Sequence, residues 1–171
     1  MVRILFYALL FLVSVLFQTF LFDNLAVSIY LSPLVYIAFI ALLPMETPPI
    51  VMLLCGLATG IVTDWAMGLE GINTAVTLLS AFTRRAVLQS ACGKENVREG
   101  GVPTVWRLGN YSFMLYLFSF VALHHLAFFL LESLSWSLLP FVLIRFVVST
   151  LVTVCFVWLT SQLFVSKISM L

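Results

Sequence analysis

The sequence predicts an all-α membrane protein, with about six transmembrane helices packed in one bundle. Hydrophobic residues make up 63% of the 171 residues and charged residues only 9%, whereas a soluble domain carries roughly a quarter charged residues. Mean hydropathy is correspondingly high, at +1.19. The apolar residues also fall into runs close to the ~20 residues that a helix needs to cross about 30 Å of hydrocarbon.

Charged and turn residues divide the chain into six apolar runs. The runs cover roughly residues 4–22, 26–43, 50–67, 72–90, 111–131 and 138–163. Pro33 interrupts the second run, which is tolerated where neighbouring helices shield the freed backbone groups. The longest polar stretch, residues 91–110, mixes charges with glycines and a proline and is typical of a loop. We therefore expect residues 1–171 to form a single polytopic transmembrane domain.

The distribution of lysine and arginine predicts the orientation of the bundle. Positive residues accumulate in short cytoplasmic loops. With the N-terminus inside, the inner side carries seven such residues and the outer loops carry none. The seven are Arg3, Arg84, Arg85, Lys94, Arg98, Arg107 and Lys167. We therefore expect both termini in the cytoplasm, and Arg84 and Arg85 at the cytoplasmic end of the fourth run.

Ionisable side chains inside the apolar runs are candidate functional groups, because a charge in lipid is costly. At about 1.5 Å rise per residue, Asp64 and Arg145 lie at similar depths near the outer face. The sequence predicts that they interact, with Glu132, His124 or His125 as the next candidate partners. Such a cluster would lock helices together, form a ligand or partner site on the outer side, or support chemistry.

The third apolar run contains a GxxxG pattern. Gly56 and Gly60 lie one turn apart, and Asp64 follows on the same side. Small residues at this spacing let transmembrane helices approach closely. The pattern predicts either helix packing inside the bundle or a docking face for a transmembrane helix of another protein.

Catalysis finds little support in the sequence. The two histidines are adjacent, so they point about 100° apart on a helix, and His125 and Glu132 lie about two turns apart, too far to share a metal ion. No GxSxG, HExxH or glycine-rich phosphate loop is present. A net charge of +1 argues against nucleic acid as a partner. We expect no enzymatic activity, cofactor or metal ion.

Several segments together resemble a known family. Residues 30–48 read YLSPLVYIAFIALLPMETP, and they are followed by CGLATGIVTD at 55–64, GLEGINTA at 68–75, AFTR at 81–84 and HHLAFFLLE at 124–132, then by Arg145 and Ser149. This arrangement resembles MreD, the bacterial rod-shape-determining membrane protein, in the version of the Bacteroidetes lineage. The resemblance covers nearly the whole chain. Two positions depart from the family: Arg85 stands where proline is usual, and Asn73 stands where histidine is common.

The resemblance to MreD implies a fold and a role. The implied fold has six helices and is similar to the S components of energy-coupling factor transporters. The implied role is a non-enzymatic scaffold of the cell-wall elongation complex in the bacterial inner membrane. The implied partners are MreC, a single-span periplasmic protein, and through it the elongation transpeptidase, its polymerase partner and MreB. The S-component fold implies the alternative, a protein that binds or transports a small molecule or a lipid headgroup at its outer polar cluster.

Overall fold

The structure is a computed structural model that describes residues 2–23, 31–133 and 139–165. The described residues form helices joined by turns and contain no strand, which confirms the predicted all-α class. In chain order the helices are α1 (Val2–Leu16), η1 (Phe17–Asp23), α2 (Ile37–Leu42), α3 (Pro49–Met67), α4 (Ile72–Cys92), α5 (Lys94–Arg98), α6 (Val105–Leu108), α7 (Asn110–Ser133), α8 (Leu139–Thr160) and η3 (Ser161–Val165). The segments η1 and η3 are π-helical continuations of α1 and α8.

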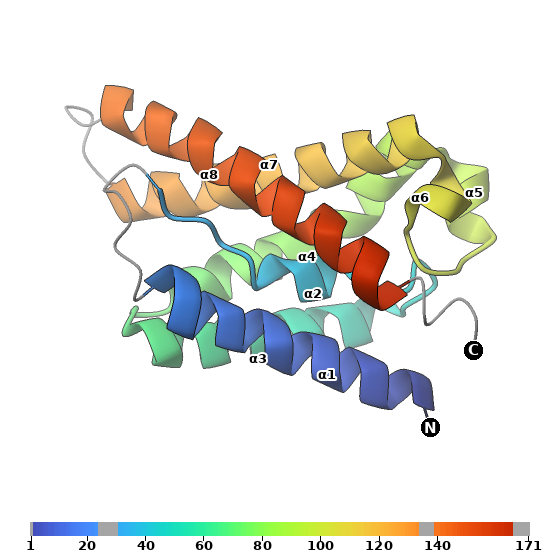
Figure 1. Ribbon diagram of the computed structural model, residues 1–171, viewed down its shortest axis with the longest axis horizontal. Coiled ribbons are helices and arrows are strands. Elements are labelled where there is room, and N and C mark those ends of the chain that lie inside the picture. Colours follow the sequence, from blue (N-terminus) through green and yellow to red (C-terminus); the bar gives the residue numbers. More distant parts are fainter. Residues whose placement is uncertain (1, 24–30, 134–138, 166–171) are drawn as a thin grey trace.

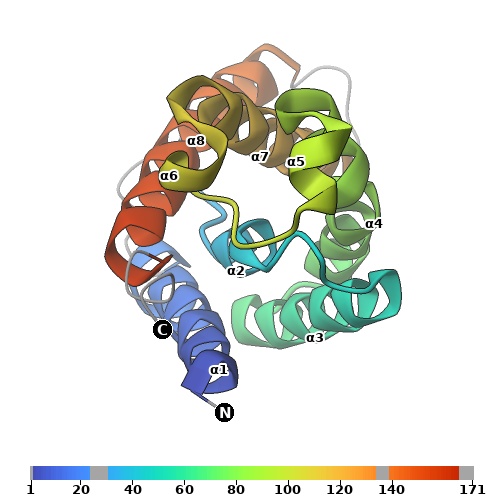
Figure 2. The ribbon, with the colours of Figure 1, turned by 90° about the vertical axis from the view of Figure 1, so that its right-hand side faces the viewer.

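Five long helices surround the short helix α2. Figure 2 shows α1, α3, α4, α7 and α8 arranged as a ring, with α2 at its centre, and α2 contacts all five of them. The start of α1 and the end of η3 lie at the same end of the bundle (Figure 1). The short helices α5 and α6 lie there too, so we call this the α5–α6 end and the other the opposite end.

The outer surface of the bundle suits a membrane. Within the described part of the chain, three helices are long and apolar enough to span one: Pro49–Met67, Asn110–Ser133 and Phe141–Leu163. The apolar helix Ile4–Phe20 is shorter, and α4 is long but carries several polar residues. Trp106 and Tyr111 are 85% and 80% exposed at the α5–α6 end, and Trp65 is 87% exposed near the end of α3. Exposed aromatic residues at both ends resemble the belts of membrane proteins.

The second predicted span differs most from the structure. A helix was predicted over residues 26–43, but residues 31–36 are not helical and α2 occupies only Ile37–Leu42; residues 24–30 lie outside the described residues. Pro33 explains the break, because it has no N–H and disfavours helix at the residue before it. Residues 33–43 are all buried nevertheless. Irregular backbone at membrane depth requires such shielding by protein.

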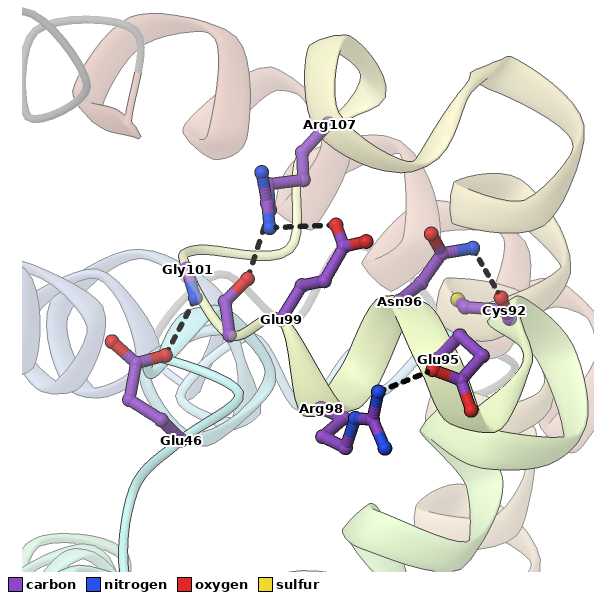
Figure 3. A network of polar contacts seen from close by, with 9 residues as sticks. Glu46, Cys92, Glu95, Asn96, Arg98, Glu99, Gly101 and Arg107 are labelled. Atoms are coloured by element: carbon purple, nitrogen blue, oxygen red, sulfur yellow. Dashed lines mark hydrogen bonds and ion pairs between the residues drawn. The ribbon is translucent and has the colours of Figure 1, made fainter.

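The remaining predicted runs correspond to helices with slightly different ends. The run 4–22 is α1 with η1, 50–67 is α3, 72–90 is α4, 111–131 is α7 and 138–163 is α8 with η3. The prediction of a loop over residues 91–110 is wrong in part, because this stretch contains the short helices α5 and α6. This segment is tied to the turn before α3: Glu46 accepts a hydrogen bond from the backbone N–H of Gly101 at 2.6 Å (Figure 3).

The two glycines of the GxxxG pattern pack inside the bundle, against α4. A Cβ atom on Gly56 would lie 2.8 Å from Cβ of Ala81, and one on Gly60 would collide with Cα of Thr74. The backbones of α3 and α4 therefore approach as closely as glycine permits. Of the two predicted roles, the structure shows internal packing, and the docking role for this face is wrong.

Candidate functional site

Side chains from the surrounding helices bind the backbone of the broken second span. Three of its backbone N–H groups donate to side chains: Ser32 to Oγ of Ser149 at 3.0 Å, Leu34 to Nε2 of His125 at 3.4 Å, and Val35 to Oε1 of Gln18 at 2.8 Å. A buried N–H without a partner costs about 1–3 kcal/mol. The polar residues of α7, α8 and η1 thus replace the hydrogen bonds that a helix would have made.

His125 is fully buried, and its two ring nitrogens serve different purposes. Its Nδ1 lies 3.0 Å from the carbonyl of Val121, which accepts only, so Nδ1 carries the proton. Nε2 of the neutral ring is then an acceptor. It receives the N–H of Leu34 at 3.4 Å and the hydroxyl of Thr153 at 3.2 Å. His125 therefore joins α7, α8 and the broken span through one ring.

His124, equally buried, belongs to a second chain of hydrogen bonds. Nε2 lies 3.0 Å from the hydroxyl of Tyr36, which donates its proton to Oδ1 of Asn73 at 2.8 Å. Nδ1 of His124 lies 2.9 Å from Oγ of Ser80, whose hydroxyl donates to the carbonyl of Val76 at 2.9 Å. These hydrogen bonds connect α7 to α4 through Tyr36 of the broken span.

Asp64 holds the start of α4. Its carboxylate accepts the backbone N–H of Asn73 at 2.9 Å, the N–H of Thr74 at 2.8 Å and the hydroxyl of Thr74 at 2.5 Å. The N-cap residue Gly71 has no side chain to do this. The first N–H groups of a helix have no partner within the helix and carry partial positive charge, so they attract a carboxylate. Asp64, on α3, supplies this cap from a neighbouring helix.

Arg145 lies at the opposite end of the bundle with a different partner. Its Nη1 lies 2.8 Å from Oε2 of Glu132, and Nε and Nη2 donate to Oγ of Ser32 at 3.1 and 2.6 Å. The guanidinium also sits 5.1 Å from the ring centre of Phe129. The two charged side chains are 21% and 33% exposed. They border a cavity of about 160 Å³, whose other walls are Gln18, Ser32, Pro33, Leu34, Met67, Leu69 and Phe128.

The prediction that Asp64 and Arg145 interact is therefore wrong, because each side chain binds other partners. Equal depth does not make two residues neighbours, because α3 and α8 occupy different positions on the ring (Figure 2). Asp64 is satisfied by the start of α4, next to its own helix. Arg145 pairs instead with Glu132, the next candidate named from the sequence.

Arg84 is more deeply placed than its predicted cytoplasmic position suggests. It is 2% exposed, and Nη1 and Nη2 donate to the carbonyls of Pro44 at 3.4 Å, Ala41 at 3.2 Å and Leu43. Nε donates to the hydroxyl of Tyr116 at 3.2 Å. These carbonyls surround the end of α2, where a helix carries partial negative charge. Arg84 thus caps α2, whereas its neighbour Arg85 is exposed.

Several residues of this polar core were not predicted from the sequence as site residues. They are neutral and scattered over five apolar runs: Gln18, Ser32, Tyr36, Asn73, Ser80, Tyr116, Ser149 and Thr153. They could have been found by looking for every hydrogen-bonding side chain within an apolar run, since such groups need partners in lipid. No three His, Cys, Asp or Glu residues gather as a metal site in the described part of the chain.

No protein-family model, curated protein or solved structure matches this chain.

Proposed function

We propose that this chain is an MreD-type scaffold of a bacterial cell-wall elongation complex, which holds other membrane proteins in place and catalyses nothing itself. The observation that carries the proposal is the use made of the interior polar groups. His125, Gln18 and Ser149 bind the broken span, while Asp64 and Arg84 hold helix ends. Side chains committed in this way stabilise a rigid frame, and the outside of the frame remains available to other helices.

The proposed topology has six crossings of the inner membrane and both termini in the cytoplasm. The shared position of the start of α1 and the end of η3 supports it (Figure 1), as does the excess of lysine and arginine at the α5–α6 end. Single cysteines can replace the exposed residues Glu70 and Lys94 in a chain whose native cysteines are alanine. An impermeant thiol reagent added to whole cells should label position 70 only. Labelling of position 94 alone would show that the protein has the opposite orientation, with both termini outside.

The proposed partner is an MreC-like protein with one transmembrane helix. An apolar groove of about 400 Å³ lies between α1 and α3, and its lining includes Ala8, Cys55 and Ala58. Small side chains permit close approach of another helix, which matters because lipid provides no hydrophobic drive for helices to associate. We propose this groove as the docking surface in place of the Gly56 and Gly60 face.

A pull-down with the co-expressed MreC-like protein tests both function and surface. Ala58→Leu fills the groove at an exposed position and should reduce capture, whereas Ala86→Leu makes the same change at an exposed position of α4 and should not. Depletion of the chain in its own bacterium should round the cells. Unchanged rod shape would refute the scaffold function, and equal capture by both variants would refute only the groove.

The second candidate function is binding of a small molecule or lipid headgroup, as in S components. The cavity of about 160 Å³ beside Arg145 and Glu132 favours it specifically, because it combines charged and apolar walls. Mass spectrometry of the purified protein should then detect a bound small molecule that is lost in Arg145→Gln. A vitamin requirement with normal rod shape after depletion would promote this candidate over the scaffold.

A further inference from the structure

A second cavity lies between α3 and α4, toward the α5–α6 end. Its volume is about 240 Å³, and its lining has two contrasting parts. Met52, Leu53 and Phe82 contribute apolar surface, and Arg84 and Arg85 contribute two positive charges. Phe82 is 74% exposed, so the apolar part continues onto the outer surface of the bundle. The cavity thus places cationic groups beside exposed apolar surface.

The positive charge of this cavity has no acidic partner among the described residues. No Asp or Glu lines it, and the hydrogen bonds of Arg84 go to neutral oxygens of the backbone and of Tyr116. Glu46, next to the lining residue Met45, is directed instead toward the backbone of Gly101 (Figure 3).

Two other arginines of the α5–α6 end, Arg98 and Arg107, are paired, in contrast. Arg98 lies 3.1 Å from Glu95, and Arg107 lies 3.3 Å from Glu99 (Figure 3). The described ion pairs at this end therefore leave out the two arginines that line the cavity. Arg85 is exposed and lines the cavity.

We propose that this cavity binds the phosphate of an anionic phospholipid. Arginine is well suited to phosphate, which accepts several of its N–H groups at once. Basic pockets between transmembrane helices are known to take anionic headgroups. The exposed apolar surface at Phe82, and at Ile50 at the start of α3, offers a place for the acyl chains. The inference does not depend on the scaffold function.

Binding is measured with the full chain in detergent, by native mass spectrometry during titration with phosphatidylglycerol or phosphatidylcholine. Arg85→Gln is the test variant, because Arg85 is exposed while Arg84 holds α2 in place. Arg98→Gln removes the same charge at the same end, from a side chain that is 81% exposed and outside the cavity. Arg85→Gln should bind phosphatidylglycerol about fivefold more weakly, the change expected from about 1 kcal/mol per basic residue. Arg98→Gln should bind like the unchanged chain, and Arg85→Lys should bind more tightly than Arg85→Gln but less tightly than the unchanged chain, because lysine keeps the charge and loses the paired N–H groups.

Three results would overturn the proposal. Equal affinity for phosphatidylcholine would remove the preference for an anionic headgroup. Equal losses in Arg85→Gln and Arg98→Gln would indicate attraction to the general charge of this end. Competition by inorganic phosphate at the same concentration as the lipid would show that the acyl chains contribute nothing, so the site would be one for free phosphate.

Discussion

Replacing Gly60 by alanine tests how closely α3 and α4 pack. The added Cβ would collide with Cα of Thr74, and it would lie 3.0 Å from N of Thr74 and 3.2 Å from O of Asn73. All three are backbone atoms, so no side-chain rotation relieves the contact. The helices must separate locally, and the start of α4 that Asp64 caps must shift with them.

The expected cost follows from two opposing terms. Overpacking a close contact costs about 1–3 kcal/mol, and alanine regains about 1 kcal/mol over glycine from helix propensity. Because all the close atoms belong to the backbone, the upper part of the first range applies, about 2–3 kcal/mol, and we expect Gly60→Ala to lower the free energy of unfolding by about 1–2 kcal/mol after both terms. Gly56→Ala should cost less, because its Cβ meets Cβ of Ala81 at 2.8 Å and only one close carbonyl, that of Thr77 at 3.3 Å.

Thermal unfolding of the purified protein in detergent measures the effect. At about 2–4 °C per kcal/mol for a chain of this size, Gly60→Ala should lower Tm by about 2–8 °C. Ala58→Leu is the control, because it adds more volume on the same helix at an exposed position and should leave Tm nearly unchanged. A Gly60→Ala variant as stable as the unchanged chain would show that the two backbones do not approach as closely as described.

Four further substitutions, two of which are also combined in a double variant, test the polar core by the same unfolding assay. Asp64→Asn should cost about 1–2 kcal/mol, because the cap of α4 loses its charge; no loss would refute the capping role. Glu132→Gln and Arg145→Gln should each destabilise, and the double variant should lose less than the sum, by about 1 kcal/mol; full additivity would refute the pair. His125→Phe should cost about 1–3 kcal/mol, because the N–H of Leu34 loses its acceptor, and an unchanged Tm would contradict that bond.

Helix positions were largely predictable from the sequence, because each apolar run had to satisfy its own backbone. This reasoning gave α3 and α7 to within one or two residues at each end. It did not give the broken second span, whose composition is as apolar as that of a regular helix. Pro33 signalled a disturbance, but its size depends on acceptors such as His125 that lie far away in the chain.

Which polar groups meet was much less predictable. Depth along a helix follows from residue counting, but position around the ring depends on how the helices are packed. Asp64 and Arg145 were matched in depth and nevertheless bind different partners. Arg84 was assigned to the cytoplasmic end by charge alone, since nothing in its run reveals that α2 ends beside it.

The polar core offers a physical reason for a broken span in a protein that we propose to be a scaffold. Lipid is as apolar as the interior of the bundle, so burying leucine or phenylalanine between helices contributes little attraction beyond packing. Separating the helices would instead strand hydrogen-bonding groups in hydrocarbon, at several kcal/mol for each unsatisfied group. Side chains such as His125 and Arg84 connect the central segment to the surrounding ring. Hydrogen bonds to the central segment therefore hold the surrounding helices together. Their outer faces need no polar groups for this purpose, so those faces are free to bind other membrane helices.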